Sequence, residues 1–116
     1  MEFTHLYTNK DKNILKTAED SLDPRIDRIE EIIEYAKEAN INRIGIANCV
    51  AFNKEADRLE KILTEAGFRT EKVNCKYGKV PFDSLVPGYK GVSCNPAGQA
   101  KYIEKKDTEL NIMMGL

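Results

Sequence analysis

The stretch that decides the fold is Arg43-Ile44-Gly45-Ile46-Ala47-Asn48, a short apolar run without polar alternation. This pattern is typical of a strand buried on both faces, as in a parallel sheet that is covered by helices. Gly45, in the middle of the run, leaves room for the close approach of a helix or a ligand. We therefore expect the chain to be organised around a parallel sheet that contains this strand.

Helices are predicted on both sides of the strand. Thr8 can cap a first helix over residues 9–20, with Asp11 in its first turn. Asp23 can cap a second, with Pro24 as its first helical residue, and this helix should end near residues 39–40. Its apolar side chains recur at helical spacing, at Ile26, Ile29, Ile32, Ile33 and Ala36.

A third helix should follow the strand, with Asn53 as its cap and Gly67 as its left-handed stop. Its apolar face is expected at Ala56, Leu59, Ile62, Leu63 and Ala66. Residues 68–74 then alternate and predict a second strand, at an edge of the sheet. The long segment 76–93 should pack down as a lid or contain a short helical turn.

The last two elements are a helix and a strand. Asn95 is a good helix cap, and Pro96 suits the first helical position. We expect this helix to turn Ala100, Ile103 and Tyr102 inward and to break at residues 107–108, before a third strand over residues 110–114. Strands separated by helices predict an α/β fold with a three-stranded parallel sheet of order 2-1-3, half of a Rossmann-like or flavodoxin-like fold.

Composition bounds the class of protein. With 41% hydrophobic and 32% charged residues, the 116-residue chain reads as one globular α/β domain over residues 1–116. The net charge of −1 and the lack of a basic stripe give no support for a nucleic-acid partner. No apolar run approaches a membrane span, and the N-terminus is no signal peptide, so we expect a cytoplasmic protein that binds no membrane. An exposed sheet edge would suit a homo-oligomer.

Three cysteines form the candidate site. Cys49 follows the first strand, Cys75 follows the second, and Cys94 begins the helix that leaves the same edge of the sheet. Because adjacent parallel strands lie about 4.8 Å apart, we expect the three sulfurs to approach one another. Zinc or an iron–sulfur cluster is the cofactor that such thiolates would hold. A fourth ligand would come from solvent, substrate, His5, Asp83 or residues outside the chain.

Two other interpretations stay open. Cys94 lies one residue outside a helix N-terminus, which favours a thiolate, so the chain could be a thiol enzyme with Cys94 as its nucleophile. Alternatively, the three cysteines are structural, and the chain is a non-catalytic module for a small ligand or another subunit. No Cys-x-x-Cys spacing or glycine-rich phosphate loop is present to choose between these readings.

The chain also resembles a known family. Residues 44–49, Cys75, the string Ser93-Cys94-Asn95-Pro96-Ala97-Gly98-Gln99-Ala100 and residues 108–116 are similar to a prokaryotic domain of unknown function that is described as metal-binding. The resemblance implies a cysteine-based metal site that uses Cys49, Cys75 and Cys94. Family members continue further at both ends with additional cysteines, so we expect a shortened member or part of a larger domain.

Four further residues are candidates for contact with a cofactor. They are Asn48, Asn95, Gly98 and Gln99, which neighbour the cysteines in the sequence or belong to the same string. Asparagine side chains next to cysteines can orient the sulfur atoms through hydrogen bonds.

Overall fold

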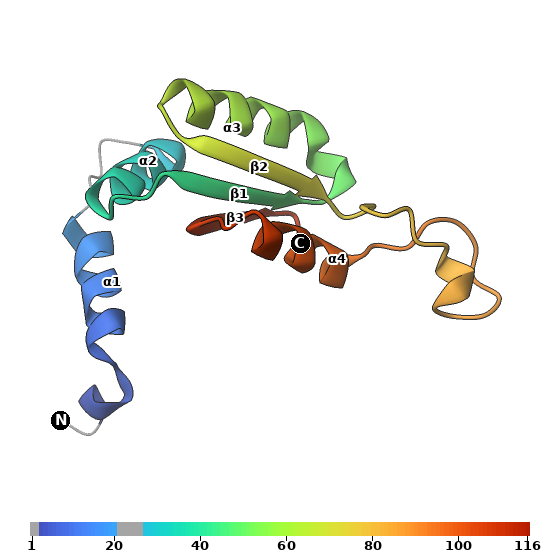
Figure 1. Cartoon of the computed structure of the whole chain (residues 1–116), viewed down its shortest axis with the longest axis horizontal. Coiled ribbons are helices and arrows are strands. Elements are labelled where there is room, and N and C mark those ends of the chain that lie inside the picture. The colour runs from blue at the N-terminus through green and yellow to red at the C-terminus, as the bar shows by residue number, and fades with distance from the viewer. Residues whose placement is uncertain (1–2, 21–26) are drawn as a thin grey trace. The chain divides into compact units, whose positions relative to one another are not determined.

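The computed structural model describes residues 3–20 and 27–116, which form two compact units (Figure 1). The first unit runs from Met1 to Ile41 and the second from Asn42 to Leu116. Each unit is described by itself below.

The first unit contains a short 3-10 helix, η1 (Thr4–Leu6), and two α-helices, α1 (Asn9–Asp20) and α2 (Arg28–Glu38). The predicted start of α1 is confirmed. The Thr8 hydroxyl accepts a hydrogen bond from the Asp11 backbone N–H at 3.1 Å, and the Asp11 carboxylate accepts one from the Thr8 N–H at 2.8 Å. This reciprocal pair satisfies two N–H groups that the helix itself leaves free.

The start of α2 differs from the prediction. The cap expected at Asp23 and the first turn at Pro24 lie outside the described residues, and the helix begins at Arg28. Asp27 is its cap, because its backbone is extended and its carboxylate accepts the Glu30 N–H at 2.8 Å. An aspartate followed three residues later by a glutamate is a sequence signature of a helix start that the prediction overlooked.

The second unit is built on three parallel strands, β1 (Arg43–Asn48), β2 (Arg69–Asn74) and β3 (Leu110–Met114). Their order, β2-β1-β3, confirms the predicted sheet and leaves β2 at an edge. Gly45 makes room for the Asn111 side chain of the neighbouring strand β3, and not for the predicted helix or ligand, since a Cβ there would lie 2.5 Å from the Asn111 side-chain oxygen.

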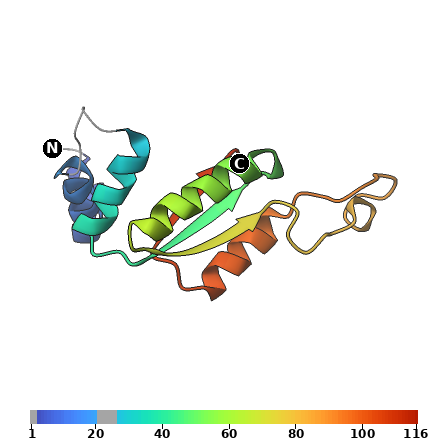
Figure 2. The same cartoon turned by 90° about the horizontal axis from the view of Figure 1, so that it is seen from above.

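Two helices cover opposite faces of the sheet, α3 (Asn53–Glu65) and α4 (Pro96–Lys105), as Figures 1 and 2 show. Two successive residues of β2 contact different helices. Lys72 pairs with Asp57 of α3, whereas Glu71 accepts a hydrogen bond from Tyr102 of α4. Buried apolar side chains fill both layers. On the α4 side, Tyr102 packs against a cluster formed by Ala47, Val73 and Ile103.

Two predictions about these helices are wrong in detail. Asn53 does not cap α3, because a 3-10 helix, η2 (Val50–Phe52), leads directly into it and makes Asn53 its first residue. Ala100 of α4 is exposed, and Gln99 is buried in its place, with 3% of its surface accessible. The inward position is polar because the side chain there reaches backbone carbonyls at the ends of the strands.

The segment between β2 and α4 contains the predicted helical turn, η3 (Phe82–Ser84). It does not pack down as a lid: Leu85 and Tyr89 are exposed, and the segment extends away from the sheet in Figures 1 and 2. The rings of Phe82 and Tyr89 contact each other instead, with centroids 5.0 Å apart.

The other edge of the sheet is β3, where the Met113 side chain is exposed. A subunit that pairs along this edge stays a prediction. In the described part of the chain, no helix is long and apolar enough to cross a membrane.

Candidate functional site

The candidate site lies at the carboxyl ends of the three strands, and 'edge' below refers to this end of the sheet. Asn48 is in register with Asn74 of β2 and with Met114 of β3. Cys49 and Cys75 are therefore the first residues beyond two neighbouring strands. In parallel α/β sheets this edge is where ligands usually bind.

Cys75 and Cys94 are held close in the chain fold. The Cys75 carbonyl accepts the Asn95 backbone N–H at 2.7 Å, which joins the end of β2 to the residue before α4. The Cys75 side chain is buried, whereas Cys94 is exposed. The Lys76 ammonium donates to Cys94 Sγ at 3.6 Å and to the Val92 carbonyl at 2.8 Å.

Cys49 sits toward β3. Its backbone N–H donates to the Met114 carbonyl at 2.9 Å. A Cβ built on Gly115 would lie 3.4 Å from Cys49 Cβ, so the two residues are in contact. A backbone hydrogen bond thus joins Cys49 to the end of β3, and another joins Cys75 to the residue that precedes α4.

The three cysteines share the predicted edge, but they do not form a preassembled metal centre. Across residues 3–20 and 27–116, no group of three or more Cys, His, Asp and Glu side chains is arranged to hold a metal ion. Of the candidate fourth ligands, His5 is part of η1 in the first unit, and the Asp83 carboxylate of η3 in the second unit accepts the Gly88 N–H at 2.9 Å. All three thiols are free.

Asn48 is the most deeply buried polar group at the edge, with 1% of its surface accessible. Its side-chain NH2 donates to the Cys49 carbonyl and to Asn53 Oδ1, both at 2.8 Å. Its Oδ1 atom has no hydrogen-bond partner. A buried polar atom without a partner is unusual, and it marks a position that a water or ligand donor can satisfy.

Asn48 also lines a polar cavity of about 190 Å³ together with Asn53, Asp57, Lys72 and Asn74. The Lys72 ammonium donates a hydrogen bond to the Asp57 carboxylate, and this bond is the main reason why the pKa of Lys72 is raised; burial opposes the shift. Sequence reasoning missed Asp57 and Lys72. No local signal could have paired them, because the two side chains meet only when α3 packs on β2.

The remaining candidates have structural contacts. Gln99 Nε2 donates to the Asn48 carbonyl at 3.2 Å and to the Val73 carbonyl at 3.1 Å, so it joins β1 to β2. Asn95 caps α4, as predicted, by accepting the Gly98 N–H at 3.0 Å. A Cβ on Gly98 would overlap the Asn95 side chain, which explains the glycine at this position.

Fold and site together define a small three-layer α/β domain whose strand ends carry free cysteines and buried amides. The chain belongs to the family described as Protein of unknown function (DUF1847), which matches residues 2–116. A relative from Methanocaldococcus jannaschii, named uncharacterized protein MJ0455, is 39% identical over 94 residues, or 77% of this chain and 48% of the relative. The chain thus spans about half the length of that curated relative. No solved structure matches the chain.

Proposed function

We propose that the domain binds a metal, either zinc or an iron–sulfur cluster, through the thiolates of Cys49, Cys75 and Cys94. The observation that carries this proposal is the common position of three free cysteines at the strand ends of one sheet. Thiolate sulfur is the preferred ligand of both cofactors. Free cysteines also fit the reducing cytoplasm, where we place the protein.

Assembly of this site requires the sulfur atoms to move together. Cys94 is exposed and precedes α4, so its side chain can turn once Lys76 releases it. A structural zinc site has four ligands, whereas the chain offers three cysteines. The relative is about twice as long as the matched region, and residues of that additional length are our proposed source of the fourth ligand.

Cobalt binding tests the proposal, because Co²⁺ replaces Zn²⁺ and shows a thiolate charge-transfer band. The present chain and the full-length relative, as a longer form of the domain, would be purified anaerobically and titrated with Co²⁺ and then with Zn²⁺. We expect one ion per chain in at least the longer form, with loss of the band in Cys49→Ser, Cys75→Ser and Cys94→Ser. Ser93→Ala, next to the site, is the matched control and should keep the band.

Iron and sulfide reconstitution of the same two forms covers the second cofactor. If neither form binds cobalt, zinc or a cluster, or if binding survives all three Cys→Ser changes, the proposal is wrong. A triple Cys→Ala variant that folds and keeps its melting temperature would then support the structural-module interpretation.

A second candidate function is a thiol enzyme with Cys94 as the nucleophile. The specific observation is the Lys76 ammonium, 3.6 Å from an exposed sulfur at the start of a ten-residue helix. A neighbouring cation and a helix N-terminus are the surroundings in which catalytic cysteines are found. We expect Lys76→Met to slow alkylation of Cys94 by iodoacetamide and to leave Cys49 unchanged. Equal rates at Cys94 in both proteins would remove this candidate.

A further inference from the structure

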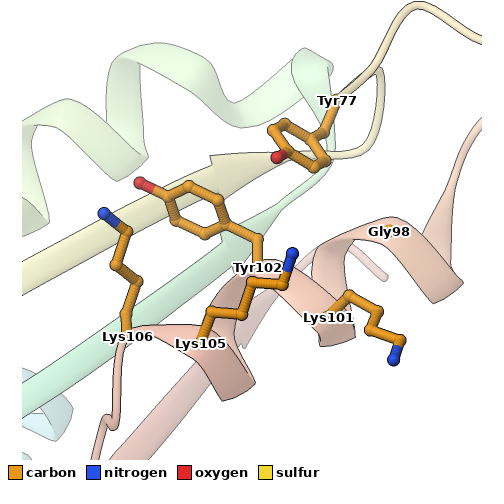
Figure 3. Close-up of a pocket in the computed structure, with 6 residues that line it drawn as sticks. All are labelled: Tyr77, Gly98, Lys101, Tyr102, Lys105 and Lys106. Atoms are coloured by element: carbon orange, nitrogen blue, oxygen red, sulfur yellow. The ribbon is translucent and has the colours of Figure 1, made fainter.

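A second cavity, of about 500 Å³, opens between α4 and Tyr77, which follows the end of β2 (Figure 3). It takes no part in the proposed metal site. It is lined by two tyrosines, three lysines and a glycine: Tyr77, Tyr102, Lys101, Lys105, Lys106 and Gly98. Its volume falls in the range of about 300–1,000 Å³ that is typical of small-molecule sites.

The two tyrosines form an aromatic wall. Their ring centroids lie 5.3 Å apart in an edge-to-face arrangement. The Tyr77 carbonyl accepts a hydrogen bond from Asn95 Nδ2 at 3.0 Å, and the Tyr102 hydroxyl donates to Glu71 at 3.2 Å. Both residues are thus tied to neighbouring elements, which lowers the entropy lost when a ligand ring packs on them.

Burial raises the pKa of Tyr102, and the Glu71 carboxylate raises it further. The phenol therefore keeps its proton at neutral pH and adds no negative charge to the wall. The Glu71 carboxylate lies next to Tyr102, and one of its oxygens accepts the hydrogen bond from the Tyr102 hydroxyl.

Basic side chains of α4 lie beside the aromatic wall. The Lys106 ammonium lies over the Tyr102 ring, 5.3 Å from its centroid. Figure 3 shows the ends of Lys105 and Lys106 on the side of the tyrosine rings, whereas Lys101 points away from them. None of the three lysines forms an ion pair within the described part of the chain. The cavity therefore presents cations that lack a counterion.

We propose that this cavity binds a nucleoside phosphate, with the base packed on Tyr77 and Tyr102 and the phosphates held by Lys105 and Lys106. A flat aromatic group matches the tyrosine wall, since aromatic side chains stack on bases of any kind. More than one negative charge is needed to match the lysines, and a phosphate chain supplies it.

Calorimetric titration of the full chain tests this inference. The probes are ADP, adenosine, which lacks the phosphates, and inorganic phosphate, which lacks the base. We expect ADP to bind at least about tenfold more tightly than either fragment, and binding to weaken as salt is added.

Two double variants separate the cavity from general charge effects. Lys105→Gln with Lys106→Gln should weaken ADP binding about tenfold, since each exposed charge pair contributes up to about a fivefold change. Arg58→Gln with Lys61→Gln removes the same charge from exposed positions of α3 and should change binding less than twofold. Far-ultraviolet circular dichroism verifies that both variants are folded.

Three results would overturn the inference. The first is no heat of binding with ADP at millimolar concentration. The second is equal weakening by both double variants, which would indicate nonspecific attraction of an anion. The third is tighter binding of a short single-stranded RNA than of ADP, which would make the basic face of α4 a nucleic-acid surface instead.

Discussion

The buried amide of Gln99 offers a test of how the strand ends are held. Its NH2 group donates to carbonyls of β1 and β2 at 3.2 and 3.1 Å, and only 3% of the residue is accessible to solvent. Gln99→Met keeps the length and the helix propensity of the side chain and removes both hydrogen bonds. In the natural chain the orientation of the Gln99 amide is fixed, because a flipped amide would turn Oε1 toward two carbonyl oxygens.

Each net hydrogen bond contributes about 1 kcal/mol, so the loss of two predicts a decrease of about 2 kcal/mol in the free energy of unfolding. For a domain of this size that corresponds to a fall in melting temperature of about 8 °C. Gln99 Oε1 has no partner, so its removal returns part of this energy, whereas the Asn48 and Val73 carbonyls lose a donor and add to the loss.

Urea unfolding followed by circular dichroism measures the change, with Glu104→Met as the matched control at an exposed position of α4. The control should stay within about 0.5 kcal/mol of the natural chain. A similarly small change in Gln99→Met would refute the reasoning. Gln99→Glu should be worse at pH 7, by about 4 kcal/mol, because its carboxylate would face two carbonyls without a donor. Burial without a donor would raise the pKa of this carboxyl, so part of that loss should return as the pH falls from 7, and this recovery should be complete below about pH 4, near the ordinary glutamate value.

Three more predictions follow from single contacts. Gly45→Ala should destabilise the chain by about 1–3 kcal/mol in thermal unfolding, because its Cβ would meet the Asn111 side chain. Two backbone N–H groups lower the pKa of Glu109. The contribution of Glu109 to stability is therefore complete at pH values above the ordinary glutamate pKa, and it is lost as the pH falls through the lowered pKa of the folded state. Glu109→Gln should flatten this part of the curve of stability against pH. Mass spectrometry of the folded chain treated with iodoacetamide should show Cys94 modified at least about tenfold faster than Cys75, which is buried, and equal rates would contradict the structure.

Much of the fold could be read from local patterns. The strand over residues 43–48 and the strand over residues 110–114 have the predicted bounds, and the sheet order 2-1-3 is confirmed. These predictions succeeded because an unbroken apolar run signals a buried parallel strand, and because right-handed crossovers leave few orders for three such strands. The caps at Thr8 and Asn95 also act within one helical turn, so the sequence contains all their partners.

The errors occur where tertiary contacts outweigh local preference. The apolar residue Ala100 is predicted on the face of α4 that packs on the sheet, yet Gln99 occupies the buried position. Its amide finds two carbonyls at the strand ends, and those acceptors exist only after β1 and β2 have paired. The segment around Leu85 and Tyr89 is apolar enough to pack on the sheet, but it contacts itself instead.

The sequence by itself determined that a parallel α/β sheet forms and that three cysteines stand where its strands end, since both follow from the spacing of residues along the chain. Only the tertiary structure decided how those thiols are separated, with Cys49 beside the end of β3 and Cys75 beside the start of α4. It alone also brought the tyrosines and lysines of the α4 cavity together. The reason is that side-chain position depends on strand twist and helix packing, which residue spacing does not specify.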